Sequence, residues 1–513
     1  MLFTWAEKNK INGYVIRVEN MRLSVPFNVC CFLISLTFSG FAFSEEGGNL
    51  NPEITQSQNQ STHQINTPVG AQQSQKTRSN DFAFFFEVER ERHWIVTTML
   101  YSLLVIVAII IIYTIRHFRF TLNRLFGHQR HPYLDIDIAD WPTVTVLIPA
   151  HNEEKVIQTI LKALLDVDYP KDRLTITPIN DRSTDKTAEL VNELATQNPE
   201  IIKPVTRDSG VEGKAAALKE VSESVTSEIL LVFDADYIPG KGLIKQLVAP
   251  FFDPEVGAMM GRVVPINVNK NILTRFLDLE RSGGYQVDQQ ARMNLHLVPQ
   301  YGGTVGGVRV TALNSIGGWD ENSLAEDTDI TYRLLIAGWK TVYQNRSECY
   351  EEVPETWPTR INQLKRWTRG HNHSTAIHSI PLLTSRRVSM LEKIDGLLLL
   401  GVYMVSPILL LGWLLAISLF FLGEHLMYGI IAVLAVTSYG ALGNFAAFFE
   451  IAAALRIDGR TRAVRLLSIN IFNFLVSLIS TSKATVGQMF PFSRSKKLYW
   501  QKTARYRKKA DKK

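Results

Sequence analysis

The chain has 513 residues, 46% of them hydrophobic and 20% charged, and a formal net charge of +6. Because the apolar residues fall into separate blocks, the composition indicates a membrane protein with a globular region rather than a uniformly soluble chain. The three cysteines, Cys30, Cys31 and Cys349, exclude a disulfide framework and a C-x-x-C site. Nucleic-acid binding is the weaker interpretation of the positive charge, since the basic C-terminal tail lacks a recognisable binding module.

Residues 1–44 are predicted to be a signal peptide or an uncleaved signal anchor. They end in an apolar run that closes with two small residues, Ala42 and Ser44, at the spacing of a cleavage site. Met21 also opens a signal peptide of ordinary length, so the residues before it are a candidate over-called start.

Residues 45–92 are rich in Gln, Ser and Asn, and until residue 81 they carry little to bury, which predicts a disordered extracytoplasmic linker. Residues 93–116 are long and apolar enough for a transmembrane helix. Basic residues follow this helix closely, namely Arg116, Arg119, Arg124 and Arg130. The positive-inside bias therefore places the region from residue 116 onward in the cytoplasm.

Residues 140–380 change to alternating strand and helix patterns. Strands are predicted at 143–150, 174–179 and 228–236, and helices at 153–167 and 183–197. Such alternation is typical of an α/β domain built on a mostly parallel sheet.

Hydrophobic segments return downstream at 396–422, 428–450 and 464–488, followed by a basic tail at 489–513. The first two predict a hairpin of transmembrane helices. The third contains Asn470, Asn473 and Lys483, and a single crossing would put the basic tail outside, against the charge rule. A crossing helix and a re-entrant segment therefore stay open. Its asparagines would face either a polar cavity or a partner helix.

Two aspartates, Asp234 and Asp236, end the strand predicted at 228–236. Ligands of open parallel sheets bind at the carboxyl ends of strands, so both carboxylates are predicted to face the binding site. Two like charges this close repel unless a cation lies near them, and hard oxygen ligands suit Mg²⁺ or Mn²⁺. Asp181 also follows a strand, where it would contact a nucleotide or cap the next helix.

Three further stretches carry candidate binding residues, each with an ordinary structural alternative. Lys214 opens a helix after glycines and would contact a phosphate, or it is a plain surface lysine. Glu326 and Asp327 lie at a helix start, where they would serve chemistry or simply cap the helix. The segment 361–371 would bind phosphate and a sugar ring, or form an amphipathic helix at the membrane.

Residues 140–380 contain a series of short motifs, which are, in order, "PAHNEE", "NDRSTD", "GKAAAL", "FDAD", "GGTVGG", "AEDTD" and "QLKRW". In this order and spacing, the motifs make the region resemble membrane-integrated family 2 glycosyltransferases of the cellulose, hyaluronan and poly-N-acetylglucosamine synthase kind. The resemblance implies an α/β GT-A domain (Rossmann-like, mostly parallel sheet) in the cytoplasm, joined to transmembrane helices. Ala325 stands where the family usually has Thr or Ser, and "NDRSTD" replaces the usual "DDGSTD". Neither change removes a carboxylate, and the "GGTVGGVR" stretch leaves the donor sugar open.

On the donor side, the resemblance implies that Asp181 contacts the uracil and ribose of a UDP-sugar and that Lys214 helps to hold the nucleotide. It further implies that Asp234 lies beside the diphosphate and that Asp236 ligates Mg²⁺ or Mn²⁺.

On the acceptor side, the resemblance implies that Asp327 is the general base, within a catalytic pair with Glu326. Gln363, Arg366 and Trp367 match the Q-x-x-R-W signature of polymer-forming members, which binds the diphosphate and the acceptor terminus.

The resulting expectation is an inverting, processive glycosyltransferase that extends a β-linked polysaccharide from UDP-GlcNAc or UDP-Glc at the inner membrane. A transferase acting on a lipid or polyprenyl phosphate, and a non-catalytic nucleotide sensor, are the alternatives. The expected partners are the donor, the growing polysaccharide, membrane lipid and an accessory export or regulatory subunit, without nucleic acid.

Overall fold

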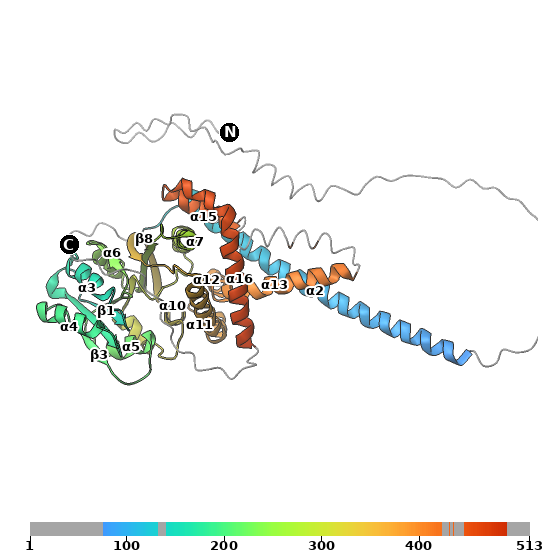
Figure 1. Ribbon diagram of the computed structural model, residues 1–513, viewed down its shortest axis with the longest axis horizontal. Helices are drawn as coiled ribbons and strands as arrows, with labels where there is room; N and C mark the ends of the chain where they lie inside the picture. Colours follow the sequence, from blue (N-terminus) through green and yellow to red (C-terminus); the bar gives the residue numbers. More distant parts are fainter. Residues whose placement is uncertain (1–74, 132–139, 423–429, 431–433, 435–445, 490–513) are drawn as a thin grey trace, which may run out of the picture. The chain divides into compact units, whose positions relative to one another are not determined.

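A computed structural model describes residues 75–131, 140–422, 430, 434 and 446–489 (Figure 1). The predicted signal segment 1–44 and the basic tail lie outside these residues. The first helix, α2 (Gln75–Phe126), begins inside the stretch that the sequence predicts to be disordered. Residues 75–92 belong to the predicted linker 45–92 by sequence, whereas the structure has them in this helix.

One eight-stranded sheet forms the centre of the globular region. Its strands are β1 (Val144–Ala150), β2 (Leu174–Asp181), β3 (Val205–Arg207), β4 (Ile229–Val232), β5 (Ile238–Pro239), β6 (Val256–Pro265), β7 (Gly306–Arg309) and β8 (Lys340–Glu351). They lie in the order β3-β2-β1-β4-β7-β6-β8-β5. Strands β3, β2, β1 and β4 are parallel neighbours, as are β6 and β8, whereas β7 runs antiparallel to both β4 and β6. The expected α/β sheet is confirmed, with β7 and the short edge strand β5 running opposite to the other strands.

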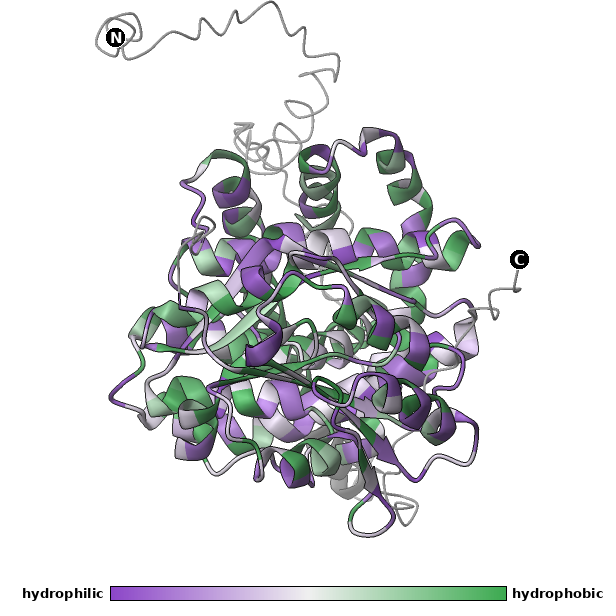
Figure 2. Cartoon of the chain, turned by 90° about the vertical axis from the view of Figure 1, so that its left-hand side faces the viewer, coloured by the Kyte–Doolittle hydropathy of each residue, from purple (hydrophilic) through white to green (hydrophobic). Residues whose placement is uncertain are grey.

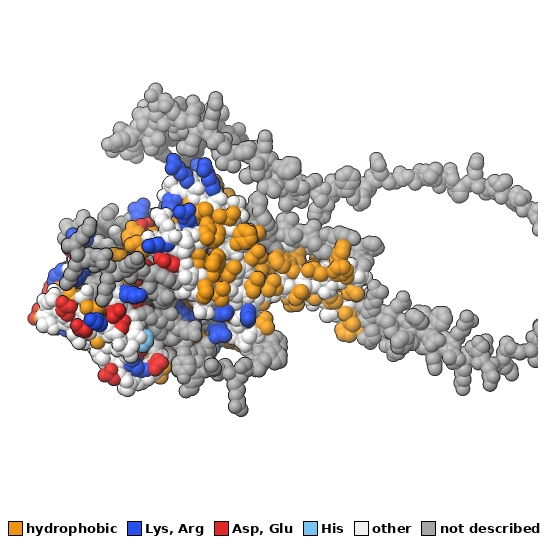
Figure 3. Space-filling view, in the orientation of Figure 1, with side chains coloured by type: hydrophobic (Ala, Val, Ile, Leu, Met, Phe, Trp, Pro, Cys, Tyr) orange, Lys and Arg blue, Asp and Glu red, His pale blue; other side chains and the backbone are white. Residues whose placement is uncertain are grey.

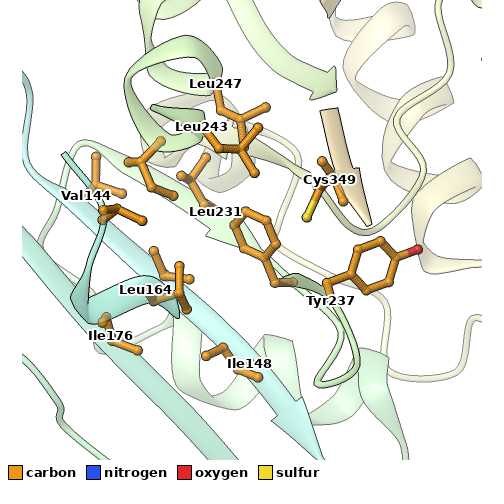
Figure 4. Packing of buried hydrophobic residues seen from close by; sticks show 14 of the residues in the cluster. Val144, Ile148, Leu164, Ile176, Leu231, Tyr237, Leu243, Leu247 and Cys349 are labelled. Atoms are coloured by element: carbon orange, nitrogen blue, oxygen red, sulfur yellow. The ribbon is translucent and has the colours of Figure 1, made fainter. Parts of the chain in front are cut away.

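Alternate residues of the central strands face two separate apolar layers. Ile148 and Leu231 pack in a cluster with α3 (Ile157–Leu165) and α6 (Leu243–Val248). Their neighbours Leu147 and Leu230 pack on the opposite face with α5 (Lys214–Ser222) and α10 (Glu326–Ala337). This is the period-two pattern of a strand that is covered on both sides. Figure 4 shows the first layer, in which Leu231, Leu164 and Leu247 meet. Figure 2 shows the same central strands in the colour of hydrophobic residues.

The helices of the globular region cover this sheet. They are α3 (Ile157–Leu165), α4 (Thr187–Gln197), α5 (Lys214–Ser222), α6 (Leu243–Val248), α7 (Ile272–Ser282), α8 (Gln290–Asn294), α9 (Val310–Ser315) and α10 (Glu326–Ala337), with a π-helical turn, η4 (Gly283–Gln289), between α7 and α8. The glycine that follows α10, Gly338, adopts a left-handed conformation, as is usual at a helix C-terminus.

Downstream, α11 (Trp357–Thr384) is followed by α12 (Met390–Leu400), α13 (Val405–Phe421), α15 (Ala446–Ile457) and α16 (Leu467–Met489). Three described stretches are long and apolar enough to cross a membrane: Trp94–Phe126, Met390–Phe421 and Thr461–Met489. They cover all but the first residue of the expected span 93–116, all but the last residue of 396–422 and all of 464–488, and α16 is one continuous helix. Most of the expected span 428–450 lies outside the described residues.

The apolar helices pack together through α2, α13 and α16. Buried residues of α2 such as Leu103 and Ile110 lie in one apolar cluster with Leu409 of α13 and Leu478 of α16. Their other sides carry exposed hydrophobic side chains, including Tyr101, Leu414 and Phe472. Figure 3 shows hydrophobic side chains gathered over the apolar helices, with Lys and Arg near the borders of this region. Such a band is the expected appearance of a surface that contacts lipid.

Candidate active site

The candidate residues lie beyond the carboxyl ends of parallel strands. Asp181 is the last residue of β2, and Asp234 and Asp236 follow β4 by two and four positions. Because β1 pairs in parallel with both β2 and β4, these ends lie at one edge of the sheet. The sequence pattern located this edge, since each strand is a buried apolar run that stops at a carboxylate.

Lys214, the first residue of α5, joins three separate parts of the chain. Its ammonium nitrogen lies 2.9 Å from Asp234 Oδ1 and 3.2 Å from Glu326 Oε1, and it donates a hydrogen bond of 2.8 Å to the carbonyl of Gly303. Burial acts to lower the pKa of Lys214, but the two carboxylates outweigh it, so the pKa lies above its ordinary value. The surface-lysine alternative is therefore wrong: Lys214 is a fixed, charged cation between two acids.

Glu326 and Asp327 are the first two residues of α10, so both carboxylates lie at its positive end. Burial raises the pKa of Glu326, while Lys214 acts against this rise. Burial also raises the pKa of Asp327, against the hydrogen bond of 2.6 Å that the Thr328 amide donates to its Oδ1 atom. A half-buried acid with a raised pKa is more basic when ionised than an ordinary aspartate, which suits proton abstraction.

Gly303 allows this cluster to close. Its φ of +70° is in the left-handed region, and a Cβ atom there would stand 3.1 Å from the Cβ of Asp327 and 3.2 Å from Glu326 Oε1. A side chain at this position would therefore meet both strain and crowding. The glycine lets the backbone carbonyl approach Lys214.

Asp181 lies apart from the lysine cluster. One oxygen accepts a hydrogen bond of 3.1 Å from the amide of Gly213, and the other lies 2.9 Å from the guanidinium of Arg207. Asp185, not Asp181, accepts the amide of Thr187 at the start of α4, so capping does not explain Asp181. Asp181 instead ties the end of β2 to the turn that leads into Lys214.

The two aspartates after β4 differ in their surroundings. Asp234 is about one third exposed and pairs with Lys214, whereas Asp236 is 3% exposed. Among the described residues, no cluster of three or more His, Cys, Asp or Glu side chains could hold a metal by itself. One or two carboxylates completed by substrate phosphates are the usual protein ligands of Mg²⁺ and similar ions, so this donor set fits such a cation.

Trp367, one of the signature residues of α11, lies between two cations. The guanidinium carbons of Arg281 and Arg360 lie 5.4 and 5.3 Å from the ring centroid of Trp367. Arg360 also donates a hydrogen bond of 2.8 Å to the side-chain oxygen of Gln363. Within the described part of the chain, Arg366 makes no hydrogen bond or ion pair. Its charge is therefore available to an anion.

A second network, which the sequence pattern missed, connects the aspartate loop with Trp367. The hydroxyl of Tyr237 donates to Glu351 Oε2 at 2.8 Å, and Arg281 donates to the other oxygen of Glu351 at 2.6 Å. Arg281 then covers Trp367. These residues come from three distant segments and match no short motif, so the only sequence signal was the position of Glu351 at the end of a strand pattern.

The family model described as glycosyltransferase-like family 2 matches residues 142–370. These residues are a family 2 glycosyltransferase domain. The match contains every candidate residue described above, from Asp181 to Trp367, and confirms the family that the sequence motifs predict.

The chain is similar to curated glycosyltransferases whose names differ in what they specify. "Probable glycosyltransferase YdaM" of Bacillus subtilis is 34% identical over 48% of this chain and 61% of its own length. "Probable glucomannan 4-beta-mannosyltransferase 3" of Arabidopsis thaliana is 28% identical over 52% and 50%. "Beta-monoglucosyldiacylglycerol synthase" of a Synechocystis strain is 33% identical over 46% and 49%. The chain thus spans between about half and three fifths of these relatives.

A solved structure shares the fold of the glycosyltransferase domain. The mannosyltransferase PcManGT from Pyrobaculum calidifontis, in complex with GDP-Man and Mn²⁺, superposes with a TM-score of 0.52 at 19% identity, covering 76% of this chain and 100% of that one. This likeness confirms the GT-A-like fold class.

Proposed function

We propose that this protein is an inverting glycosyltransferase that extends a β-linked polysaccharide from a UDP-sugar, UDP-GlcNAc or UDP-Glc, at the inner membrane. The observation that carries the proposal is the position of Lys214 between Asp234 and Glu326, beside Asp327, at the strand edge of a family 2 glycosyltransferase domain. Donor, acceptor and repeated transfer are all parts of this proposal.

The donor diphosphate binds between Asp234 and α11. The cations of Lys214 and Arg366 face its negative charge. Asp181 accepts a hydrogen bond from Gly213 and so fixes the turn beside which the nucleotide part of the donor lies. As the sugar departs, charge grows on the diphosphate, and cations that are already fixed stabilise it without reorganisation. Asp236, with Asp234 beside it, would hold Mg²⁺ or Mn²⁺, which supplies further positive charge on the same phosphates.

Asp327 takes the proton from the acceptor hydroxyl, which attacks the anomeric carbon on the face opposite the diphosphate. The bond to the diphosphate breaks as the new glycosidic bond forms, so the anomeric configuration inverts. Support comes from the raised pKa of Asp327 and from its location on the positive end of α10. Glu326 keeps Lys214 in place.

Trp367 is proposed to contact the acceptor terminus, with Gln363 on the same helical face. Polymer extension is supported by the Q-x-x-R-W signature and by a relative named as a glucomannan mannosyltransferase. Transfer to a lipid is the second candidate, which the relative named as a diacylglycerol glycosyltransferase favours.

A cytoplasmic catalytic domain at the inner membrane is supported by three candidate spans and by the basic residues that flank α2 and α16. Asn470 and Asn473 are buried within α16 and would line an export path or bond to a neighbouring helix.

The test is a screen of the purified full chain in lipid with labelled UDP-GlcNAc, UDP-Glc and GDP-Man, with products separated by size. Long products from one UDP-sugar support the proposal, whereas products carrying one sugar on lipid favour the second candidate. Asp327→Asn should lower the transfer rate by about 10²–10⁴-fold while UDP binding is kept. Absence of transfer from every donor, or an unaffected rate in this variant, would contradict the proposal.

A further inference from the structure

We propose that Thr328 and His371 are positioning residues, which form a buried hydrogen-bonded chain that fixes the Asp327 carboxylate for proton abstraction. This inference rests on the proposed role of Asp327 as the base. Thr328 follows Asp327 on α10, and His371 comes from α11, four residues after Trp367.

The chain is short and is centred on a buried hydroxyl. The hydroxyl of Thr328, whose side chain is 0% exposed, lies 3.3 Å from Asp327 Oδ1 and 3.2 Å from His371 Nε2. On its other side, the side-chain nitrogen of Gln300 donates to the same hydroxyl at 2.9 Å. Three residues from separate segments therefore converge on one hydroxyl next to the proposed base.

The number of available protons decides the direction of these bonds. Thr328 has one hydroxyl proton, and the ionised Asp327 can only accept. If Thr328 gives this proton to Asp327, His371 must donate to Thr328 through Nε2–H. In the opposite assignment, Thr328 would donate to Nε2 of His371, and Asp327 would lose the hydrogen bond from the hydroxyl. The ring proton of His371 would then lie on Nδ1, a buried atom that has no hydrogen-bond partner among the described residues. We therefore assign the proton to Nε2.

The ring of His371 stays neutral at the pH of the cell, because burial lowers its pKa to about 4. It lies against Tyr403, with ring centroids 4.8 Å apart. A neutral donor holds Thr328 without adding a charge that would weaken Asp327 as a base.

The titratable groups that face Asp327 from the surrounding elements are Lys214, Glu326, Tyr301, Tyr285 and Tyr403.

The backbone fixes the position of His371. At the preceding residue, Gly370, a Cβ atom would stand 2.7 Å from the Cβ of Ala325, so α11 lies directly on the start of α10. Farther along α11, His378 reaches Asp329 at 2.9 Å and holds the two helices in the same register. The contact between His371 and Thr328 is therefore set by helix packing.

The consequence for the base is one of orientation. The amide and the hydroxyl of Thr328 both point to Oδ1 of Asp327, and within the described residues no hydrogen bond reaches Oδ2. Oδ2 is thus the oxygen that accepts the proton. A donor to the ionised form also lowers the pKa of a carboxylate, so the hydroxyl sets the pH at which Asp327 becomes active.

The experiment measures kcat/KM against pH for the full chain in lipid, using the donor found in the screen. Thr328→Val removes the hydroxyl and should move the acidic limb of the profile upward by about half to one pH unit. It should also lower kcat about tenfold with little change in the donor KM. His371→Asn, too short to reach Thr328, should move the limb in the same direction, whereas His371→Gln keeps an N–H at the ε position and should leave the limb in place.

Thr368→Val is the matched control, because Thr368 is also a buried threonine, on α11, but its hydroxyl bonds to the carbonyl of Leu364. Its profile should stay in place. The inference is overturned if the limb is the same in wild type, Thr328→Val and His371→Asn, or if His371→Gln shifts it as much as His371→Asn does. If Thr328→Val does not fold, the two His371 variants decide. Transfer that persists in Asp327→Asn would instead overturn the proposed base.

Discussion

Gly370 lies so close to Ala325 that a Cβ atom at the glycine would stand 2.7 Å from the Cβ of the alanine. This approach brings the helix of the Q-x-x-R-W signature onto the first turn of the helix that carries Glu326 and Asp327. Two motifs that lie apart in the sequence therefore share one interface.

Gly370→Ala should destabilise the protein and misplace α11. Overpacking of a tight contact costs about 1–3 kcal/mol, and the backbone of Leu324 and Ala325 has little room to give way. Thermal unfolding and the transfer rate of the purified variant measure the two effects. Gly487→Ala on α16 is the control, because no atom lies within 4 Å of its added Cβ, and it should unfold at the wild-type temperature or above.

Lys214→Met should abolish donor binding and leave Asp234 and Glu326 as facing, unneutralised acids. The loss of Lys214 should raise the pKa of Glu326 further, so the folded variant should bind more protons than the unfolded chain. Its unfolding free energy should then increase as pH falls from 8 to 5. Titration calorimetry with UDP and unfolding at several pH values measure both effects. Lys219→Met, at an exposed pair on the same helix, should change neither.

Glu351→Gln should make Arg281, and with it the ring of Trp367, less firmly positioned. The neutral amide cannot balance the charge of Arg281, which is partly buried over Trp367, and removing one partner of a fully buried ion pair costs about 3–5 kcal/mol, an upper bound here. We expect a fall in unfolding temperature and a rise in the acceptor KM. Tyr237→Phe removes only one hydrogen bond to Glu351 and should cost about 1 kcal/mol. An equal loss in both variants would argue against the ion pair as the main contributor.

Because of Asp329, the unfolding free energy of the protein should depend on pH in the acidic range. Burial acts to raise its pKa, but hydrogen bonds from His378 and Arg333 outweigh it, so its pKa lies below the ordinary value. A carboxylate with a lowered folded pKa stabilises the protein above its unfolded pKa of about 3.9, and this stabilisation is lost as pH falls below that value. Unfolding free energies from pH 6 to 3 should fall less steeply in Asp329→Asn than in wild type.

Removal of divalent cations should stop transfer. Chelation with EDTA is expected to abolish activity, and Mg²⁺ or Mn²⁺ should restore it. The reason is that the two carboxylates and the proposed diphosphate are all negatively charged, so a cation is needed to balance them. Asp236→Asn should raise the metal concentration needed for half-maximal activity at least tenfold. Asp166→Asn is the control, since Asp166 belongs to another D-x-D stretch and pairs with Lys241 at the surface. Activity that survives complete chelation would contradict the metal proposal.

The sequence by itself determined the fold class and the edge at which the site lies. Buried runs such as those before Asp181 and Asp234 are strands because both faces are apolar, and parallel strands put their carboxyl ends on one edge. The spacing of the motifs was enough to predict the family. The apolar length of α2, α13 and α16 was likewise readable from composition, because a span depends on local hydrophobicity alone.

Only the tertiary structure decided which residues meet. Lys214 had the pattern of either a phosphate ligand or a surface lysine, and its contacts with Asp234 and Glu326 exclude the surface lysine. The bond between Thr328 and His371 joins positions 43 residues apart, and neither residue stands out in the sequence. Contacts of this kind depend on how α10 and α11 pack, which is set by many side chains at once and by the missing Cβ of Gly370, and so no local pattern encodes them.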